Sequence, residues 1–249
     1  MSDSTVRIAM WSGPRNISTA MMRSFGSRSD CAVTDEPFYA AYLVGTGLIH
    51  PMRDEVIASQ PTDWREVAAA LLGPAPDGKP VWYQKHMTHH MLPEFGRDWM
   101  DGLVNAFLIR APEAVLASYS RKRDDFTLDE IGLPMQAQIF DRVADRLGRA
   151  PPVIESEDVL ADPAGTLAAL CAACGVPFDP AMLSWAPGRR ATDGVWAPAW
   201  YEAVERSTRF AEPRREVGVD GLPDRAKRLA GAALPIYDRL AAHKLRASR

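Results

Sequence analysis

Residues 6–25 place the tightest constraint on the fold of this chain. An apolar run of strand length covers residues 6–11, and the turn residues Ser12, Gly13 and Pro14 follow it directly. Beyond them the sequence leads into a short helical pattern. A strand, a tight Gly/Pro turn with hydroxyl groups and a helix, in that order, form the layout of a phosphate-binding loop.

The start of this helix is the place where an anion is expected. The first backbone N–H groups of a helix have no internal partners, and the helix dipole adds positive potential at the same end. The residues expected around a phosphate are Ser12, Gly13, Pro14, Arg15, Asn16, Ile17, Ser18 and Thr19. The Gly-Lys-Ser/Thr ending of nucleotide triphosphatase loops, which reaches terminal phosphates and magnesium, is absent. A plain strand-to-helix turn with Ser18 as the N-cap is the alternative interpretation.

Length and composition indicate one globular α/β domain over residues 1–249. The hydrophobic content of 47% and the charged content of 24% are ordinary for such a domain. The net charge of −3 gives no general attraction to nucleic acid or to an anionic membrane, so an anion site has to be local. With three Cys and no signal-peptide or membrane-spanning pattern, we expect a cytoplasmic protein.

Strand and helix patterns alternate along most of the chain. Further strands are predicted at residues 31–34, 81–86, 104–109 and 152–155, and helices at residues 38–45, 63–72, 112–123, 129–147, 162–175 and 223–245. This alternation predicts a three-layer α/β/α fold with a central parallel sheet. The Trp-, Pro- and Arg-rich segment 186–215 has little periodicity and is predicted to be a lid or an acceptor-side loop.

Charged side chains follow the second and third predicted strands. Asp35 and Glu36 come after the second strand, and Lys85 and His86 end the third. Ligands of open parallel sheets bind beyond the carboxyl ends of the strands, so chemistry is expected here. The alternative for the carboxylates is N-capping of the next helix. Although three of the five His lie within residues 86–90, no further ligand stands at a zinc-like spacing, and we expect no metal site.

The fourth predicted strand also ends in a cation. Arg110 follows the apolar run 104–109, and a helix begins at Pro112 with Ser118 about two turns further on. An arginine at a strand end that faces a helix start is a second anion-binding arrangement. The alternative for Ser118 is a hydrogen bond back to the helix carbonyl four residues earlier.

Taken together, these stretches resemble the sulfotransferases that use 3′-phosphoadenosine 5′-phosphosulfate (PAPS), a family of the phosphate-loop superfamily with many bacterial members. SGPRNIST at residues 12–19 is similar to their 5′-phosphosulfate loop, and RAPEAVLAS at residues 110–118 to their 3′-phosphate motif. IESEDVL at residues 154–160, which leads to an apolar helix, is similar to the strand and helix that follow. The resemblance spans most of residues 6–178.

The resemblance implies a reaction and roles for these residues. The 5′-phosphate would be held by the backbone of residues 16–19 with the hydroxyls of Ser18 and Thr19, and the 3′-phosphate by Arg110 and Ser118. A sulfuryl group would pass in line from PAPS to a hydroxyl or amine of a small-molecule acceptor, leaving adenosine 3′,5′-bisphosphate. A sulfuryl group carries less charge than a phosphoryl group, so no metal would be required.

Two departures from the family pattern affect the catalytic residues. Many relatives have Lys where this chain has Arg15, which cannot donate a proton at neutral pH, so Lys85 is a candidate for that role. Relatives take their base either from a His after the third strand, here His86, or from a Glu after the second, here Glu36. His86 is preferred because the unperturbed pKa of histidine lies near the working pH.

Other functions remain open from the sequence alone. An ATP-dependent kinase or hydrolase of the same superfamily would require ATP and magnesium, and a silent nucleotide-binding module would tolerate loss of both His86 and Glu36. Neither a nucleic acid nor a membrane is expected as a partner. Whether the protein forms a homodimer is not determined.

Overall fold

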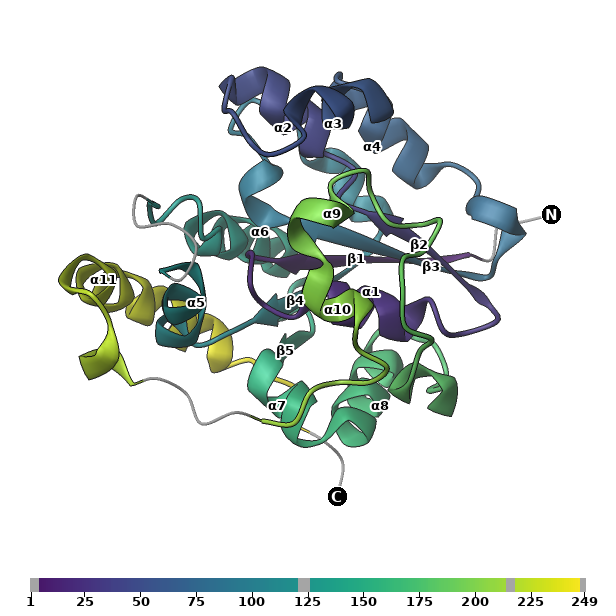
Figure 1. The fold of residues 1–249 in the computed structure, drawn as a ribbon. Helices are drawn as coiled ribbons and strands as arrows, with labels where there is room; N and C mark the ends of the chain where they lie inside the picture. Colours follow the sequence, from purple (N-terminus) through teal and green to yellow (C-terminus); the bar gives the residue numbers. More distant parts are fainter. Residues whose placement is uncertain (1–4, 121–125, 214–217, 247–249) are drawn as a thin grey trace.

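The computed structural model describes residues 5–120, 126–213 and 218–246. Within these ranges, five parallel strands form one sheet in the order β2-β3-β1-β4-β5 (Figure 1). The strands are β1 Val6–Ser12, β2 Cys31–Asp35, β3 Val81–Met87, β4 Val104–Ile109 and β5 Val153–Glu155. All five predicted strands are therefore present, and the predicted α/β fold with a central parallel sheet is confirmed.

Eleven α-helices connect and cover these strands in the described part of the chain. They are α1 Ser18–Phe25, α2 Tyr39–Thr46, α3 Arg53–Ser59, α4 Trp64–Leu72, α5 Pro112–Tyr119, α6 Leu133–Leu147, α7 Ser156–Ala161, α8 Pro163–Ala173, α9 Ala197–Trp200, α10 Glu202–Glu205 and α11 Asp224–Ala241. The helix predicted from residue 129 begins four residues later, because Gly132 has a φ of 76° and stands outside it as the N-cap. The end predicted for the helix after Pro112, residues 121–123, lies outside the described residues.

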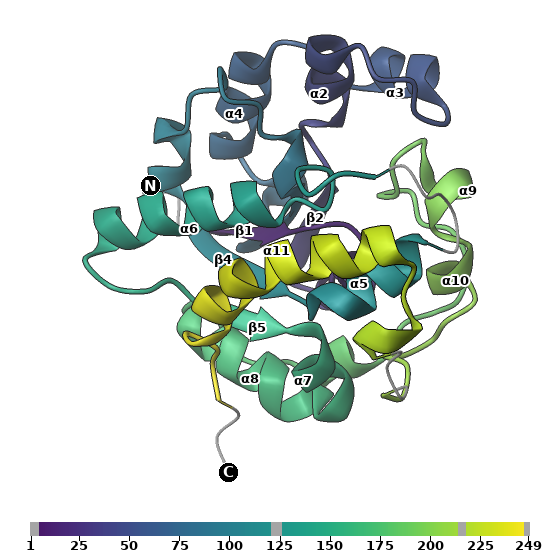
Figure 2. The same ribbon diagram turned by 90° about the vertical axis from the view of Figure 1, so that its left-hand side faces the viewer.

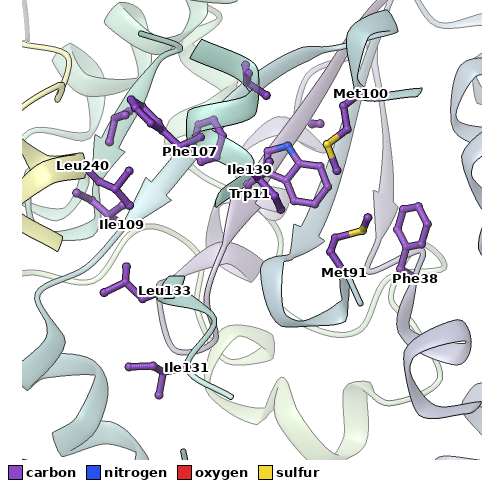
Figure 3. Close-up of a cluster of buried hydrophobic side chains, with 14 of the residues drawn as sticks. Trp11, Phe38, Met91, Met100, Phe107, Ile109, Ile131, Leu133, Ile139 and Leu240 are labelled. Atoms are coloured by element: carbon purple, nitrogen blue, oxygen red, sulfur yellow. The ribbon is translucent and has the colours of Figure 1, made fainter. Parts of the chain in front are cut away.

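The sheet is buried on both faces, which explains why its strands are apolar runs rather than alternating patterns. On one face α4, α5, α6 and α11 cover a core that contains Trp11, Phe107 and Ile109 (Figures 2 and 3). On the other face α1, α2 and α8 cover Ile8, Met10 and their neighbours. Successive side chains of one strand therefore belong to different cores.

Residues 184–210, here called the strap, lie across the second of these faces. Apart from α9 and α10 the strap is irregular, and in Figure 1 these two helices stand in front of the sheet. Its ends are joined by a bridge between Ser184 and Arg209. Its buried side chains are Trp185, Trp196, Ala197, Tyr201 and Phe210. The predicted lid segment 186–215 corresponds to most of the strap, although residues 214 and 215 lie outside the described residues.

Candidate active site

The predicted phosphate-binding loop joins β1 to α1 in a strained conformation. Arg15 and Ile17 have φ angles of 65° and 55°, in the left-handed region that non-glycine residues seldom adopt. Ile17 is the N-cap of α1 and provides no side-chain hydrogen bond, so Ser18 is not the N-cap. The N–H groups of the first turn of α1 therefore depend on other partners, as an anion-binding loop requires.

Gly13 is the loop residue whose small size the fold requires. A Cβ atom at this position would lie 2.3 Å from the carbonyl oxygen of Ile131. On the other side of the loop, the Arg110 guanidinium donates a hydrogen bond to the Arg15 carbonyl oxygen at 3.0 Å. The Ser156 hydroxyl donates to the Asn16 carbonyl oxygen at 3.1 Å. The loop is thus held by the segment before α6 and by the ends of β4 and β5.

Two cavities meet at this loop. The first, the arginine cavity, has a volume of about 460 Å³ and contains Arg15, Arg110 and Arg209. The second, the aromatic cavity, has a volume of about 400 Å³ and contains Tyr39, Tyr42 and His90. Both cavities share a boundary that is formed by Arg15, Ser18, Thr19, Ser118, Trp200 and Tyr201. A group bound at the start of α1 would therefore be accessible from either side.

The arginine cavity brings together the two halves of the predicted 3′-phosphate motif. Arg110, which follows β4, and Ser118 of α5 both line it. The Arg15 guanidinium donates to the Ser118 hydroxyl at 2.8 Å, which links the two predicted anion sites. Glu157, which was not predicted, accepts a hydrogen bond from Arg110 at 2.9 Å, and the two side chains are 22% and 30% exposed.

The aromatic cavity has a buried cluster of charges in its wall. The Lys85 ammonium donates to Asp35 at 2.9 Å, to Glu36 at 2.6 Å and to the Tyr201 hydroxyl at 2.6 Å. An ammonium group has three N–H donors, so these three acceptors satisfy it completely. Lys85 is only 1% exposed. In this geometry Lys85 holds two carboxylates in place and has no N–H left for a substrate.

The backbone of Glu36 is fixed as firmly as its side chain. Its φ of 40° is positive, and its N–H donates to the Lys85 carbonyl oxygen at 3.0 Å. Its own carbonyl oxygen accepts from the Gln60 side-chain amide at 3.1 Å. A strained residue that the surrounding contacts hold firmly is a frequent feature of functional sites.

Burial changes the proton affinities of this cluster. Desolvation raises the pKa of Glu36, and the charge of Asp35 raises it further, while Lys85 opposes both effects. Burial alone would lower the pKa of Lys85, but the two carboxylates raise it above its ordinary value. The cluster therefore consists of a charged lysine and a carboxyl group, Glu36, that takes up a proton more readily than an exposed glutamate.

His86 does not lie beside Lys85 and Glu36, although it is the next residue along β3. Its side chain points to the opposite face of the sheet, stacks on Trp11 at 4.4 Å between ring centroids and lines neither cavity. Burial lowers the pKa of His86 to about 3. The expectation that His86 reaches the acceptor is therefore corrected, because the two-residue period of a strand places Lys85 and His86 on different faces.

The histidines that do line the aromatic cavity are His50, His89 and His90. His90 stacks on Tyr39 at 4.5 Å and on Tyr42 at 4.8 Å between ring centroids. Burial lowers the pKa of His89 to about 3, so its imidazole is neutral at physiological pH. Within the described residues, no group of three or more His, Cys, Asp or Glu side chains is arranged to hold a metal ion.

Tyr201 and Glu157 are the site residues that the sequence did not predict. Tyr201 lies in the aperiodic segment, where no pattern distinguishes one aromatic residue from another. Glu157 belongs to the IESEDVL stretch, but its contact with Arg110 depends on how β5 leads into α7. Asp35 was noted only as a strand-end carboxylate, and its pairing with Lys85 could have been anticipated from the adjacency of β2 and β3.

The structure thus places a strained loop at the start of a helix, beside the carboxyl edge of a parallel sheet, in an α/β protein. The family model described as "Sulfotransferase domain" matches residues 6–246. The chain therefore belongs to the sulfotransferase domain family.

Two solved structures support the same fold. The sulfotransferase domain from the curacin biosynthetic pathway is 17% identical, with a TM-score of 0.54 over 97% of this chain and 99% of that one. The sulfotransferase from Alicyclobacillus acidocaldarius is 12% identical, with a TM-score of 0.53 over 95% of this chain and 94% of that one. At these identities the likeness concerns the fold alone.

Curated relatives from Arabidopsis thaliana have a different kind of name. They are "Branched-chain-amino-acid aminotransferase-like protein 2" and "Branched-chain-amino-acid aminotransferase-like protein 1", 33% and 34% identical over 236 residues. The match covers 95% of this chain but only 41% and 42% of those proteins. Each name thus describes a protein more than twice as long as the region that matches.

Among the helices that the structure describes, none has the length and hydropathy needed to span a bilayer.

Proposed function

We propose that this protein transfers a sulfuryl group from PAPS to a hydroxyl or amine of a small molecule, with the donor in the arginine cavity and the acceptor in the aromatic cavity. The observation that supports this assignment is the shared boundary at the loop, where Arg15, Ser18 and Thr19 line both cavities. A group carried on the 5′-phosphate would meet the acceptor at this boundary, which satisfies the demand for proximity.

The donor would be held by the two linked anion sites. The N–H groups at the start of α1, with Ser18 and Thr19, would bind the 5′-phosphosulfate, and Arg110 and Ser118 the 3′-phosphate. The cavity presents three arginines and two glutamates, an excess of positive charge that suits an anionic nucleotide. Sulfuryl transfer of this kind requires no magnesium in our proposal, because Arg15 of the loop supplies the positive charge. The low cysteine content supports a cytoplasmic setting.

Glu36 is proposed as the general base in place of His86. Glu36 lines the aromatic cavity and has a raised pKa, whereas His86 lies in the opposite core. Glu36 would accept the proton of the acceptor O–H or N–H while the acceptor atom forms its bond to sulfur. The bond between sulfur and the bridging oxygen breaks at the same time, and adenosine 3′,5′-bisphosphate leaves with that electron pair. Arg15 would stabilise the negative charge that develops on the transferred group and the bridging oxygen.

Lys85 receives a different role from the one that the sequence suggested. Its three N–H donors are occupied by Asp35, Glu36 and Tyr201, so it does not reach the leaving group in this geometry. We propose instead that Lys85 holds Glu36 and compensates part of the buried negative charge. The charge-stabilising role toward the donor then belongs to Arg15 alone.

Ligand-induced thermal stabilisation tests the donor assignment without knowledge of the acceptor. Adenosine 3′,5′-bisphosphate at about 100 times its Kd should stabilise the protein by roughly 2.7 kcal/mol, a rise in Tm of about 5–10 °C. AMP, which lacks the 3′-phosphate, should give a smaller rise, and Arg110→Ala should bring the two ligands to the same value. A rise with ATP and magnesium but not with the bisphosphate would favour the kinase function. No rise with any of these ligands would favour the silent module.

A further inference from the structure

The strap reaches the wall of the aromatic cavity through the Tyr201 hydroxyl, whose bonding capacity is used in full. It accepts hydrogen bonds from the Lys85 ammonium at 2.6 Å and from the Trp196 indole N–H at 3.1 Å. Its lone pairs are thus engaged, and its single proton is donated to Asp35 at 2.8 Å, while Glu36 Oε1 lies 3.4 Å away as a second, weaker acceptor. The hydroxyl is therefore fixed in both position and orientation.

The same carboxylate also anchors the strap backbone. The Gly194 N–H donates to Asp35 at 3.1 Å, so Asp35 accepts from Lys85 on β3 and from two groups of the strap. One residue earlier, Asp193 forms a two-point pair with Arg23 of α1 at 2.5 and 2.7 Å. Both side chains of this pair are buried, at 2% and 0% exposure. The hydrogen bonds that hold the strap in place therefore also hold the carboxylate–lysine cluster, which consists of Asp35, Glu36 and Lys85.

We propose that Tyr201 is a positioning residue for the cluster of Asp35, Glu36 and Lys85. Its hydroxyl connects the strap to Lys85 and so keeps the proposed base, Glu36, at the wall of the aromatic cavity. The role of Glu36 as the base rests on the proposed function, whereas the positioning itself does not. The physical reason is the number of hydrogen-bond donors and acceptors in the cluster. Without the hydroxyl, one N–H of Lys85 loses its acceptor and Asp35 loses a donor, so the ammonium has to find a new partner inside the cavity wall.

The groups that face Glu36 determine what a titration would detect. Those that act on it directly are Asp35, Lys85, Tyr39 and Tyr201, and the same cavity is also lined by Arg15, His50, His89, His90 and Glu130. Lys85 and the Tyr201 hydroxyl lower the pKa of Glu36, while burial and Asp35 raise it. Removal of the hydroxyl should therefore move the titration of Glu36 to higher pH.

The test follows the Glu36 carboxyl carbon by NMR in ¹³C-labelled protein, with its signal assigned from its loss in Glu36→Gln. In Tyr201→Phe, Glu36 should titrate about 1–2 pH units higher than in the wild type, the shift expected for one lost hydrogen bond to a charged group. Tyr83→Phe is the matched control. It removes a buried phenol hydroxyl that lies on the same face of β3 as Lys85. This hydroxyl has no hydrogen-bond partner among the described residues, so its removal should leave the titration of Glu36 unchanged.

A titration of Tyr201→Phe that matches the wild type would overturn the proposal. If Tyr201→Phe does not fold, Trp196→Phe decides, because it removes the indole N–H while keeping an aromatic ring, and it should shift the titration in the same upward direction by a smaller amount. An unchanged titration in Trp196→Phe would then overturn the proposal in its turn. The outcome is independent of the bisphosphate experiment, so a failure of the donor assignment and a failure of the positioning role are distinguishable.

Discussion

The two cavities contain ion pairs of opposite character. In the arginine cavity, Arg110 and Glu157 are both partly exposed, and the pair stands where an anion is proposed to bind. In the wall of the aromatic cavity, Lys85 is almost completely buried and has three acceptors for its three N–H groups. A partly exposed pair contributes little to stability and can exchange partners, whereas a buried one has no second partner available.

This difference suggests a division of labour within one site. On the proposed donor side the charges are partly exposed and could rearrange around a bound nucleotide, whereas on the proposed acceptor side they are fixed without any ligand. Preorganised groups are the ones that lower a barrier, because they require no reorganisation during the reaction. Three substitutions test the contrast, in order of decreasing effect.

Replacement of the buried cation should have the largest effect on stability. Lys85→Met leaves Asp35 and Glu36 buried without a counter-charge, which should lower the free energy of unfolding by about 3–5 kcal/mol in urea denaturation at pH 7. Arg110→Ala removes the partly exposed cation of the other pair, and it should lower the free energy of unfolding by less than about 1 kcal/mol. Equal losses from the two variants would remove the contrast between the cavities.

The same variant has a pH dependence whose sign can be worked out. Burial raises the pKa of Glu36, so the folded state binds its proton more readily than the unfolded chain does. Stability then falls as the pH rises through this range and recovers as the pH falls. The loss in Lys85→Met should therefore be smaller at pH 5 than at pH 7. A loss that grows toward low pH would contradict the assignment of a buried carboxylate pair.

Exchange of the proposed base should have the next largest effect, this time on turnover. Once an acceptor is found, Glu36→Gln should reduce kcat by about 10²–10⁴-fold, the range of general base catalysis. In the wild type, kcat/KM should rise with pH through an apparent pKa above the ordinary value for glutamate, because burial raises that pKa. Release of adenosine 3′,5′-bisphosphate provides the assay.

His86→Phe is the control for that experiment. It keeps an aromatic ring against Trp11 and removes the titratable nitrogens, so kcat should stay within a few-fold of the wild type. A loss of 10²-fold or more in this variant, with Glu36→Gln active, would return the role of base to His86.

Neutralisation of Glu157, the partly exposed partner of Arg110, should have the smallest effect, here on nucleotide affinity. Glu157→Gln removes the carboxylate that competes with a 3′-phosphate for Arg110. Because partly exposed pairs contribute about 0.2–1 kcal/mol, the affinity for adenosine 3′,5′-bisphosphate should rise by roughly 1.4- to 5-fold in calorimetric titrations. The affinity for AMP should not change. A fall in the affinity for the bisphosphate would show that Glu157 assists binding of the nucleotide.

The sequence predicted the sheet well because its strands are buried on both faces and so appear as apolar runs. It missed α3, in which Val56 is the buried residue and which therefore gives no amphipathic signal. The rule that ligands bind beyond the carboxyl ends of strands located Glu36 and Lys85. The preference for His86 failed on a finer point, since adjacent strand residues face opposite ways and Lys85 and His86 cannot serve one cavity.

The sequence could not predict that Tyr201, from a distant segment, is a hydrogen-bond partner of Asp35 and Lys85. Tyr201 lies 166 residues from Asp35, and its neighbours follow neither a helical nor a strand period. Pairing over such a distance depends on the folded topology, here on a strap that crosses the face of the sheet. The pairing of Arg110 with Ser118 was easier to anticipate, because Arg110 lies two residues before α5, and Ser118 stands near the end of that same helix.

The long separation between Tyr201 and its partners also has a consequence for synthesis on the ribosome. Lys85 and Tyr201 are 116 residues apart, so at about 5–20 residues per second the strap follows β3 by roughly ten seconds. During that interval the nascent chain already contains Asp35, Glu36 and Lys85 but not the hydroxyl that completes their bonding. Contacts of such high sequence separation form late in folding. The cluster of Asp35, Glu36 and Lys85 is thus completed only after the strap has been synthesised.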